Sequence, residues 1–429
     1  MKSLSGSTLR DVLRRSFGFL PAVGILAGLV LGFVLPVVDR ALRIDFGIFS
    51  FTERDSARSL LETIASVTVS VAGVGFSVTI VAFTLASQQL SPRVLRTFQA
   101  NRLSQVTLAV FVGSFVYCLV LLSALGDDIP DLAMVFAIVL VIAAFALFVA
   151  FIHDIIGSLE PSTLIRRIAT DARTAVAGRY PARVGEDPAD VDAAEREAEA
   201  LMLTEAVAVR AARAGFLVSV EGDALITAAR EHEGIVRQRA QIGDFVITGS
   251  VLAEAWSGSD APGLAASVRG AFRQEDERTI VQDVAFPIRQ LSDVALKGLS
   301  PSLNDPTTAE NAIDSLTDTL IVFIRTKSPP RVRVDRDGRP RLVARAPALG
   351  DLVRLGFEQV RVKAASYPVV AGRMLFLLGE LRREARDNRL DDAEILRQAR
   401  LIAEGPAGET PTEADVEGVR EAHRRFEGR

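Results

Sequence analysis

Four long apolar runs dominate the pattern of hydrophobic and polar positions along the chain. They cover residues 17–38, 64–86, 106–125 and 132–152, and none contains an ionised side chain. At about 1.5 Å per residue, a helix of this length crosses the roughly 30 Å of hydrocarbon in a bilayer. The pattern predicts an α-helical polytopic membrane domain over residues 1–153, with four transmembrane helices in contact with the lipid bilayer.

The short segments between the runs predict how the helices are oriented. Arginine and lysine favour the cytoplasmic side of a membrane. The segment between the second and third runs contains three arginines and no acid, whereas the segment between the third and fourth contains three aspartates and no base. Together with the basic N-terminus, this asymmetry predicts a multi-pass membrane protein with both termini in the cytoplasm.

The second run carries small and hydroxylated residues at steps of three and four. Positions with this spacing stay on one face of a gently supercoiled helix. The row consists of Thr63, Ser66, Ser70, Gly73, Ser77, Thr84 and Ser87. A second small row, which includes Thr68, Gly75 and Ala82, is predicted beside it. The helix therefore has one thin, mildly polar side and one large, apolar side.

Two interpretations fit this row. Small residues let helices approach closely in lipid, and their hydroxyls bond across the interface. Alternatively, the row lines a pore on the axis of a symmetric homo-oligomer, where hydroxyls keep the lumen wettable. Arg93 and Arg96 would then lie at the cytoplasmic mouth, in a short helix that begins at Pro92. The row is predicted to line a pore, to pack helices, or to do both.

Composition supports the membrane domain and excludes several chemistries. Of the 429 residues, 49% are hydrophobic, and the mean hydropathy of +0.28 is high for a soluble protein. The net charge is -4 with no long block of one sign, so no nucleic-acid partner is expected. One cysteine, Cys118, and three separated histidines exclude an internal disulfide and a local zinc site. No cofactor, metal or catalytic residue is predicted.

After the fourth run the sequence predicts a cytoplasmic α+β region. Residues 154–190 are interpreted as a linker, and residues 191–257 as a small domain with strands at 215–220 and 235–242. The stretch IGDFVITGSVLAEA resembles the hairpin of lipoyl- and biotinyl-type barrels, where glycines turn the strands sharply. No lysine stands in it for cofactor attachment, so we expect a small β-barrel for assembly or binding.

Residues 258–429 are predicted to be mainly helical. One helix is expected from Pro287 to Gly298, and another after Asp305, with Asp305 as N-cap and Pro306 in the first helical position. The alternating segment 331–345 with its Asp337-Gly338 pair predicts a β-hairpin. The remaining chain is expected to be helical at 351–365, 369–386, 391–403 and 413–424.

Polar residues cluster between positions 278 and 305. An enzyme would use the aspartates there as a general base or cation ligands. Alternatively, the cluster consists of helix caps and ion pairs, since no nucleophile, histidine or phosphate-binding loop accompanies it. Its members are Arg278, Gln282, Asp283, Arg289, Asp293, Lys297, Asn304 and Asp305.

Four segments resemble a known bacterial family. VTVSVAGVGFSVTIVAFTLASQQLSPRVLRTF, SFVYCLVLL, IGDFV and VQDVAFPIRQLSDVALKGLSPSLNDPTTA are together similar to the membrane proteins of domain of unknown function 2254. The resemblance covers nearly the whole chain and implies a polytopic inner-membrane protein with a cytoplasmic domain, without implying an activity. The chain departs from the family pattern at Val281, where glutamate is usual, and at Pro287 and Ser302, where glycine is usual.

Three functions are compatible with these observations. The first is a homo-oligomeric channel or transport-like pore lined by the second span, with a cytoplasmic domain for assembly or gating. The second is a membrane-anchored scaffold or sensor whose cytoplasmic domain binds a partner or a small ligand. The third is a membrane-bound enzyme that uses the 278–305 cluster.

Overall fold

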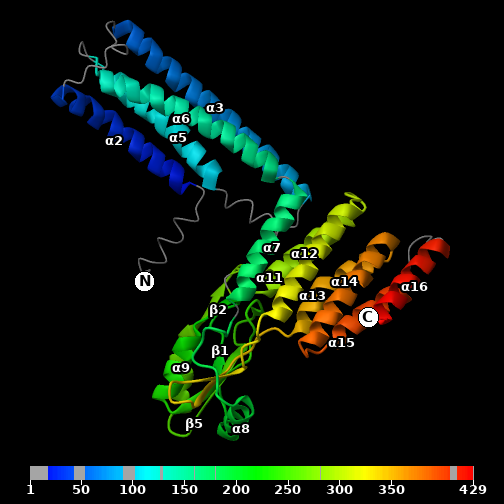
Figure 1. Cartoon of the computed structure of the whole chain (residues 1–429). Coiled ribbons are helices and arrows are strands. Elements are labelled where there is room, and N and C mark those ends of the chain that lie inside the picture. Colours follow the sequence, from blue (N-terminus) through cyan, green and yellow to red (C-terminus); the bar gives the residue numbers. More distant parts are fainter. Residues whose placement is uncertain are drawn as a thin grey trace. The chain divides into compact units, whose positions relative to one another are not determined.

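The computed structural model describes residues 18–42, 54–89, 102–125, 129–158, 160–178, 180–280, 282–405 and 413–428. Internal contacts divide the chain into two compact units, one up to Thr163 and the other from Leu164 onward. The first unit contains the apolar helices, and the second is a mixed α/β region (Figure 1). Each unit has its own hydrophobic core.

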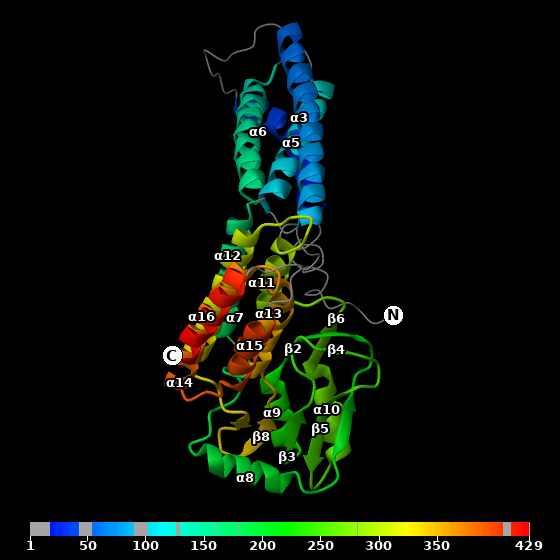
Figure 2. The same cartoon turned by 90° about the vertical axis from the view of Figure 1, so that its right-hand side faces the viewer.

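The described part of the first unit is a bundle of four helices, α2 (Phe19–Leu42), α3 (Arg54–Gln89), α5 (Arg102–Ser123) and α6 (Asp131–Ser158). Each is long and apolar enough to cross a membrane, as predicted. α3 begins well before the predicted span, because no glycine or proline interrupts the helix between Arg54 and Ile64. Helix α5 is central (Figure 2). In its most apolar stretch 50% of the residues are buried, against 17% in the corresponding stretch of each of the other three helices.

Helix α2 packs against α5 through a row of glycines. Gly24, Gly28 and Gly32 follow one another at steps of four, and so share one face of α2. A Cβ atom at Gly28 would collide with the carbonyl oxygen of Gly113 in α5, and one at Gly32 would lie 2.8 Å from the Val120 side chain. The absence of side chains therefore sets the distance between these two helices, as small-residue motifs do in lipid.

The second unit contains two antiparallel-rich sheets rather than one barrel. The first sheet has the order β1 (Val207–Arg210), β5 (Val251–Ser257), β3 (Gly234–Gln238), β8 (Pro340–Val343) and β7 (Val332–Val334), with β3 and β8 parallel. The second sheet has the order β4 (Phe245–Val246), β2 (Gly215–Val220) and β6 (Phe272–Glu275). Short helices α9 (Gly222–Glu231) and α10 (Ala261–Val268), followed by the 3-10 turn η2 (Arg269–Ala271), contribute to the larger core.

The lipoyl-like barrel is not confirmed. The two strands of its expected hairpin, β4 and β5, lie in different sheets: β4 pairs with β2, and β5 pairs with β1 and β3. Gly243 instead adopts a positive φ of 93° in a turn before β4. A Cβ there would lie 2.6 Å from both Arg278 and Asp283, so glycine is required by a close approach rather than by a barrel corner.

Helices complete the second unit. Part of the expected linker is helical and forms α7 (Pro161–Ala177). Arg173 of α7 pairs with Asp318 of α12 (Pro306–Arg325). Helix α8 (Val191–Leu201) packs its alanines on Ile235 and Trp256. The remaining described helices pack against one another. They are α11 (Ala285–Gly298), α12 (Pro306–Arg325), α13 (Leu349–Ala364), α14 (Pro368–Asp387), α15 (Ala393–Glu404) and α16 (Glu413–Glu427).

Several local predictions for this unit are confirmed. Asp305 is the N-cap of α12, its carboxylate accepts the Thr308 amide at 3.0 Å, and Pro306 occupies the first helical position. Strands β7 and β8 form the expected hairpin, with Gly338 at a φ of 76° in the turn. In both cases the signal is local, because a cap or a turn depends on neighbouring residues alone.

Candidate functional site

The predicted row of small residues on α3 is exposed along its whole described length. Thr63, Ser66, Ser70, Gly73, Ser77, Thr84 and Ser87 all lie on the open surface of the first unit. Among the described residues, no atom outside the local helix backbone lies within 4 Å of the position that a Cβ would take at Gly73. The row therefore makes no close contact with the helices of its own bundle.

The second small row serves the bundle instead. Thr68 and Ala82 are buried, and a Cβ at Gly75 would meet the Phe148 ring of α6 at 3.3 Å. At about 100° per residue, this row lies roughly 160° around the helix from the exposed row. The prediction that the two rows are neighbours is therefore wrong: they occupy opposite faces of α3, one inward and one outward.

The hydroxyls of the exposed row bond to their own helix. Ser70 Oγ donates to the Ser66 carbonyl at 2.9 Å, and Ser77 Oγ donates to the Gly73 carbonyl at 3.0 Å. Thr84 makes the same bond to Ile80 at 2.8 Å. Each donor is thus satisfied inside the helix, while the hydroxyl oxygen can still accept a hydrogen bond from water or from another chain.

The structure describes one end of this exposed face and not the other. At the N-terminal end of α3, Glu62 forms an ion pair with Arg58 at 2.9 Å, and both side chains are more than half exposed. Arg93, Arg96 and the short helix predicted to begin at Pro92 lie outside the described residues. The predicted cytoplasmic mouth therefore rests on the sequence alone.

In the 278–305 cluster of the second unit, Asp283 and Arg278 form a buried pair. The Arg278 guanidinium donates to both carboxylate oxygens, at 2.8 and 3.0 Å, and stacks over the Phe286 ring at 5.2 Å. The Asp283 carboxylate also accepts the Phe286 amide at 3.0 Å, in the first turn of α11. Burial raises the pKa of Asp283 above its ordinary value, although Arg278 and the amide bonds oppose that shift.

Apart from Lys297, the other members of this cluster also have partners inside the protein. The Gln282 side chain accepts the Val220 amide at 3.0 Å and so extends the bonding of β2. Arg289 lies 3.3 Å from Asp293 and donates to Gln359 of α13 at 2.9 Å. The Gln282 and Gln359 bonds each join two elements of the unit, whereas the Arg289–Asp293 pair lies within α11.

Asn304 and Asp305 shape the turn before α12. Asn304 has a positive φ of 46°, and its side chain accepts the Tyr367 hydroxyl at 3.1 Å. Hydrogen bonds from the Thr308 side chain and amide hold the pKa of Asp305 below its ordinary value. The contacts of the whole cluster favour the interpretation as caps and ion pairs over the catalytic one.

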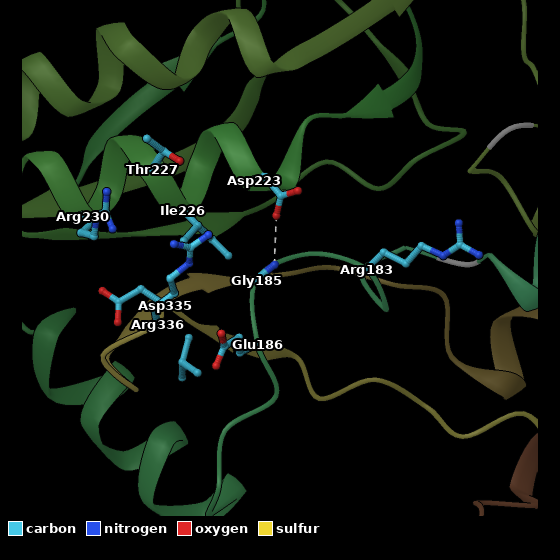
Figure 3. Close-up of a pocket in the computed structure, with 10 residues that line it drawn as sticks. Arg183, Gly185, Glu186, Asp223, Ile226, Thr227, Arg230, Asp335 and Arg336 are labelled. Carbon is cyan, nitrogen blue, oxygen red and sulfur yellow. Dashed lines mark hydrogen bonds between the residues drawn. The ribbon is translucent and has the colours of Figure 1, made fainter.

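A pocket of about 580 Å³ in the second unit was not predicted from the sequence (Figure 3). Its lining comes from three separate segments, at 183–186, 223–230 and 334–336. No spacing rule connects residues so far apart in the chain, so only the fold brings them together. In the first unit, by contrast, the glycine row of α2 could have been found from its steps of four.

The four apolar helices and the mixed α/β unit define an integral membrane protein with a large extramembrane part. The family model described as "Predicted membrane protein (DUF2254)" matches residues 14–380, and the chain belongs to this family. Uncharacterized proteins of Mycobacterium tuberculosis and Mycobacterium bovis are 29% identical to it over 392 residues, which span 88% of this chain and 74% of each relative. No solved structure is significantly similar to the chain.

Proposed function

We propose that this membrane protein self-associates through the exposed row of α3 and that the row lines a path for water and small solutes. The observation that supports the proposal is the outward position of seven small or hydroxylated residues on a helix whose inward face already packs on its bundle. A hydroxyl gains nothing from facing hydrocarbon, because lipid tails offer it no hydrogen bond. A second copy or water would use this face.

The same sequence features support a placement for the assembly. Arginines between the second and third spans, and aspartates between the third and fourth, favour an inner bacterial membrane with both termini in the cytoplasm. Arg93 and Arg96 would then lie at the cytoplasmic mouth of the path. The second unit would form a cytoplasmic domain that assembles or gates the membrane helices.

Cross-linking in native membranes tests the self-association. Single cysteines replace Ser70 or Ser77 in a Cys118→Ala background. Matched controls carry cysteine at Val67 or Leu85, which are 37% and 44% exposed and lie roughly 60–80° around α3 from Ser70 and Ser77. Mild oxidation should give disulfide-linked dimers for Ser70→Cys and Ser77→Cys, and few for the controls. Dimers at the controls alone would contradict the proposal.

An alternative function, a membrane-anchored scaffold or sensor, is favoured by a different observation. The second unit holds a pocket with arginines along its wall, whereas its acidic cluster is engaged in internal bonds. In this alternative the α3 row would only pack against another helix, and the signal would begin in the second unit. Row cysteines that form cross-links on oxidation, but in their reduced state never react with a water-borne thiol reagent, would favour this alternative.

A further inference from the structure

The pocket of Figure 3 lies between a loop, a helix and a hairpin turn of the second unit. The loop contributes Arg183, Gly185 and Glu186 before α8. Helix α9 contributes Asp223, Ile226, Thr227 and Arg230. The end of β7 contributes Val334, and the turn after it contributes Asp335 and Arg336. Its volume of about 580 Å³ falls in the range of pockets that hold small molecules.

Three arginines line this pocket, and their side chains have no partner among the described residues. Arg183, Arg230 and Arg336 are exposed, and no guanidinium group of the three forms a hydrogen bond or ion pair with another described residue. Two other arginines of the same hairpin are used differently. Arg333 is buried against the Val184 carbonyl at 2.6 Å and pairs with Asp187, and Arg341 pairs with Asp335 at 2.7 Å. The hairpin thus separates structural arginines from available ones.

The acidic groups of the pocket only partly balance these cations. Asp335 is neutralised by Arg341 and also accepts the amides of Asp337 and Arg339, both at 3.0 Å. Asp223 accepts the Gly185 amide at 3.0 Å, and the Glu186 side chain is exposed. Neither Asp223 nor Glu186 pairs with a cation among the described residues. Three guanidinium groups therefore face two carboxylates, which leaves an excess of positive charge.

The arrangement of these groups suggests two kinds of contact. In the view of Figure 3, Arg230 and Arg336 lie at one end and Arg183 extends at the other, with Asp223 and Glu186 between them. Guanidinium groups bind phosphate oxygens through paired hydrogen bonds. Carboxylates accept hydrogen bonds from hydroxyl groups. The ends of the pocket suit an anion, and its middle suits the hydroxyls of the same molecule.

From this we infer that the pocket binds a small phosphorylated molecule that also carries hydroxyl groups, such as a nucleotide or a sugar phosphate. Arg230 and Arg336 hold the phosphate, and Asp223 and Glu186 accept from the hydroxyls. The site lies wholly in the second unit. It therefore does not depend on the role proposed for α3, and either can fail without the other.

Thermal unfolding of the full chain in detergent tests this inference. Trp256 is the sole tryptophan and is buried in the second unit, so its fluorescence reports on that unit. The probes are adenosine 5′-monophosphate and glucose 6-phosphate, compared with adenosine, glucose and inorganic phosphate. Saturation with at least one phosphorylated probe should raise the Tm by about 2–4 °C or more, because a ligand that binds only the folded state stabilises it.

Three variants decide whether the shift comes from this pocket. Arg230→Gln and Arg336→Gln should melt like the parent without ligand, since both side chains are exposed and unbonded, and should need at least tenfold more probe for the same shift. Arg269→Gln, an exposed arginine of η2 outside the pocket, is the matched control and should behave like the parent. No shift with either phosphorylated probe, an equal shift with inorganic phosphate, or an equal shift in all three variants would overturn the inference.

Discussion

The row on α3 and the polar cluster at 278–305 have the same character in sequence and opposite roles in the structure. Both gather small or polar side chains in a short stretch. The cluster turns inward, where Asp283 meets Arg278 and Gln282 meets Val220. The row turns outward, and its hydroxyls bond only to their own backbone. Polar groups that already hold elements together have no free bonding capacity for a partner. The polar groups of an open row can still bond to one.

The glycines of α2 extend the comparison to small residues. Gly28 is needed because α5 approaches it at backbone distance, and Gly73 of α3 has nothing close to its Cβ position. In a membrane helix, then, a glycine alone does not reveal whether its face is occupied. The contacts decide, and they divide these rows into one that builds the bundle and one that is available to a second molecule.

The largest effect should follow from filling the occupied row. Gly28→Leu forces a side chain into the Gly113 carbonyl, and two rigid backbones cannot move aside as a flexible side chain would. Because backbone meets backbone, the cost should exceed both the ~1–3 kcal/mol of ordinary overpacking and the roughly 3–5 kcal/mol of a broken buried ion pair. Size-exclusion chromatography in detergent should show loss of the monodisperse protein. Gly73→Leu is the control: it should fold without aggregating, although its place in the exposed row should lower the oligomeric fraction. Aggregation of both variants to the same extent would break the comparison.

Removing the buried carboxylate of the cluster should cost slightly less. Asp283→Ala leaves the Arg278 guanidinium without its partner and the Phe286 amide without its acceptor. Breaking a buried ion pair typically costs about 3–5 kcal/mol. The Trp256 fluorescence melting temperature should fall by roughly 10 °C. Asp276→Ala removes a 92% exposed carboxylate and should melt like the parent; a parent-like Asp283→Ala would remove the case that the cluster is structural.

Changing the open row should alter assembly and leave folding intact. Ser77→Leu removes a hydroxyl that bonds only within α3, so the melting temperature should stay within about 2 °C of the parent. The oligomeric fraction measured by light scattering in detergent should fall several-fold, because a bulky side chain separates the two copies. Val67→Leu, at an exposed position roughly 80° around α3 from Ser77, should keep the parent distribution. Identical distributions for both variants would count against self-association through the row.

The smallest expected effect is a loss of stability of the second unit at low pH, caused by protonation of Asp305. Hydrogen bonds lower the pKa of Asp305 in the folded state. A lowered carboxyl pKa contributes stability above the unfolded value, near the ordinary 3.8, and this contribution is lost as the pH falls through the folded value. The Trp256 melting temperature should therefore decline more steeply below about pH 4 in the parent than in Asp305→Asn. A steeper decline in the variant would reverse the assigned sign.

Local signals in the sequence predicted much of the fold. The four spans follow from apolar length, and the Asp305 cap and the turn at Gly338 follow from neighbours in the chain. Long-range pairing was not predictable in this way. Gly243 marks a turn, but it does not say that β4 joins β2 while β5 joins β1 and β3. The expected barrel failed for this reason.

The candidate site was predictable to the same limited extent. Spacing placed the residues of the α3 row on one face correctly, but it gave no direction for that face and set the second row beside it rather than opposite. The pocket arginines lie in segments more than 30 residues apart, so no motif could have assembled them. Periodicity identifies a face of a helix, and only tertiary contacts show what that face meets.

The most direct test of the account is whether water reaches the middle of the α3 row. Single cysteines at Ser66, Ser70, Gly73, Ser77 and Thr84, in a Cys118→Ala background, are exposed in native membranes to a charged, membrane-impermeant thiol reagent. Cysteines at Val67 and Leu85, which are exposed roughly 60–120° around α3 from these five positions, report the lipid side, and one at Thr68 reports the packed side. The account predicts labelling along the row and none at these three positions. Labelling confined to the two ends of the row would contradict it.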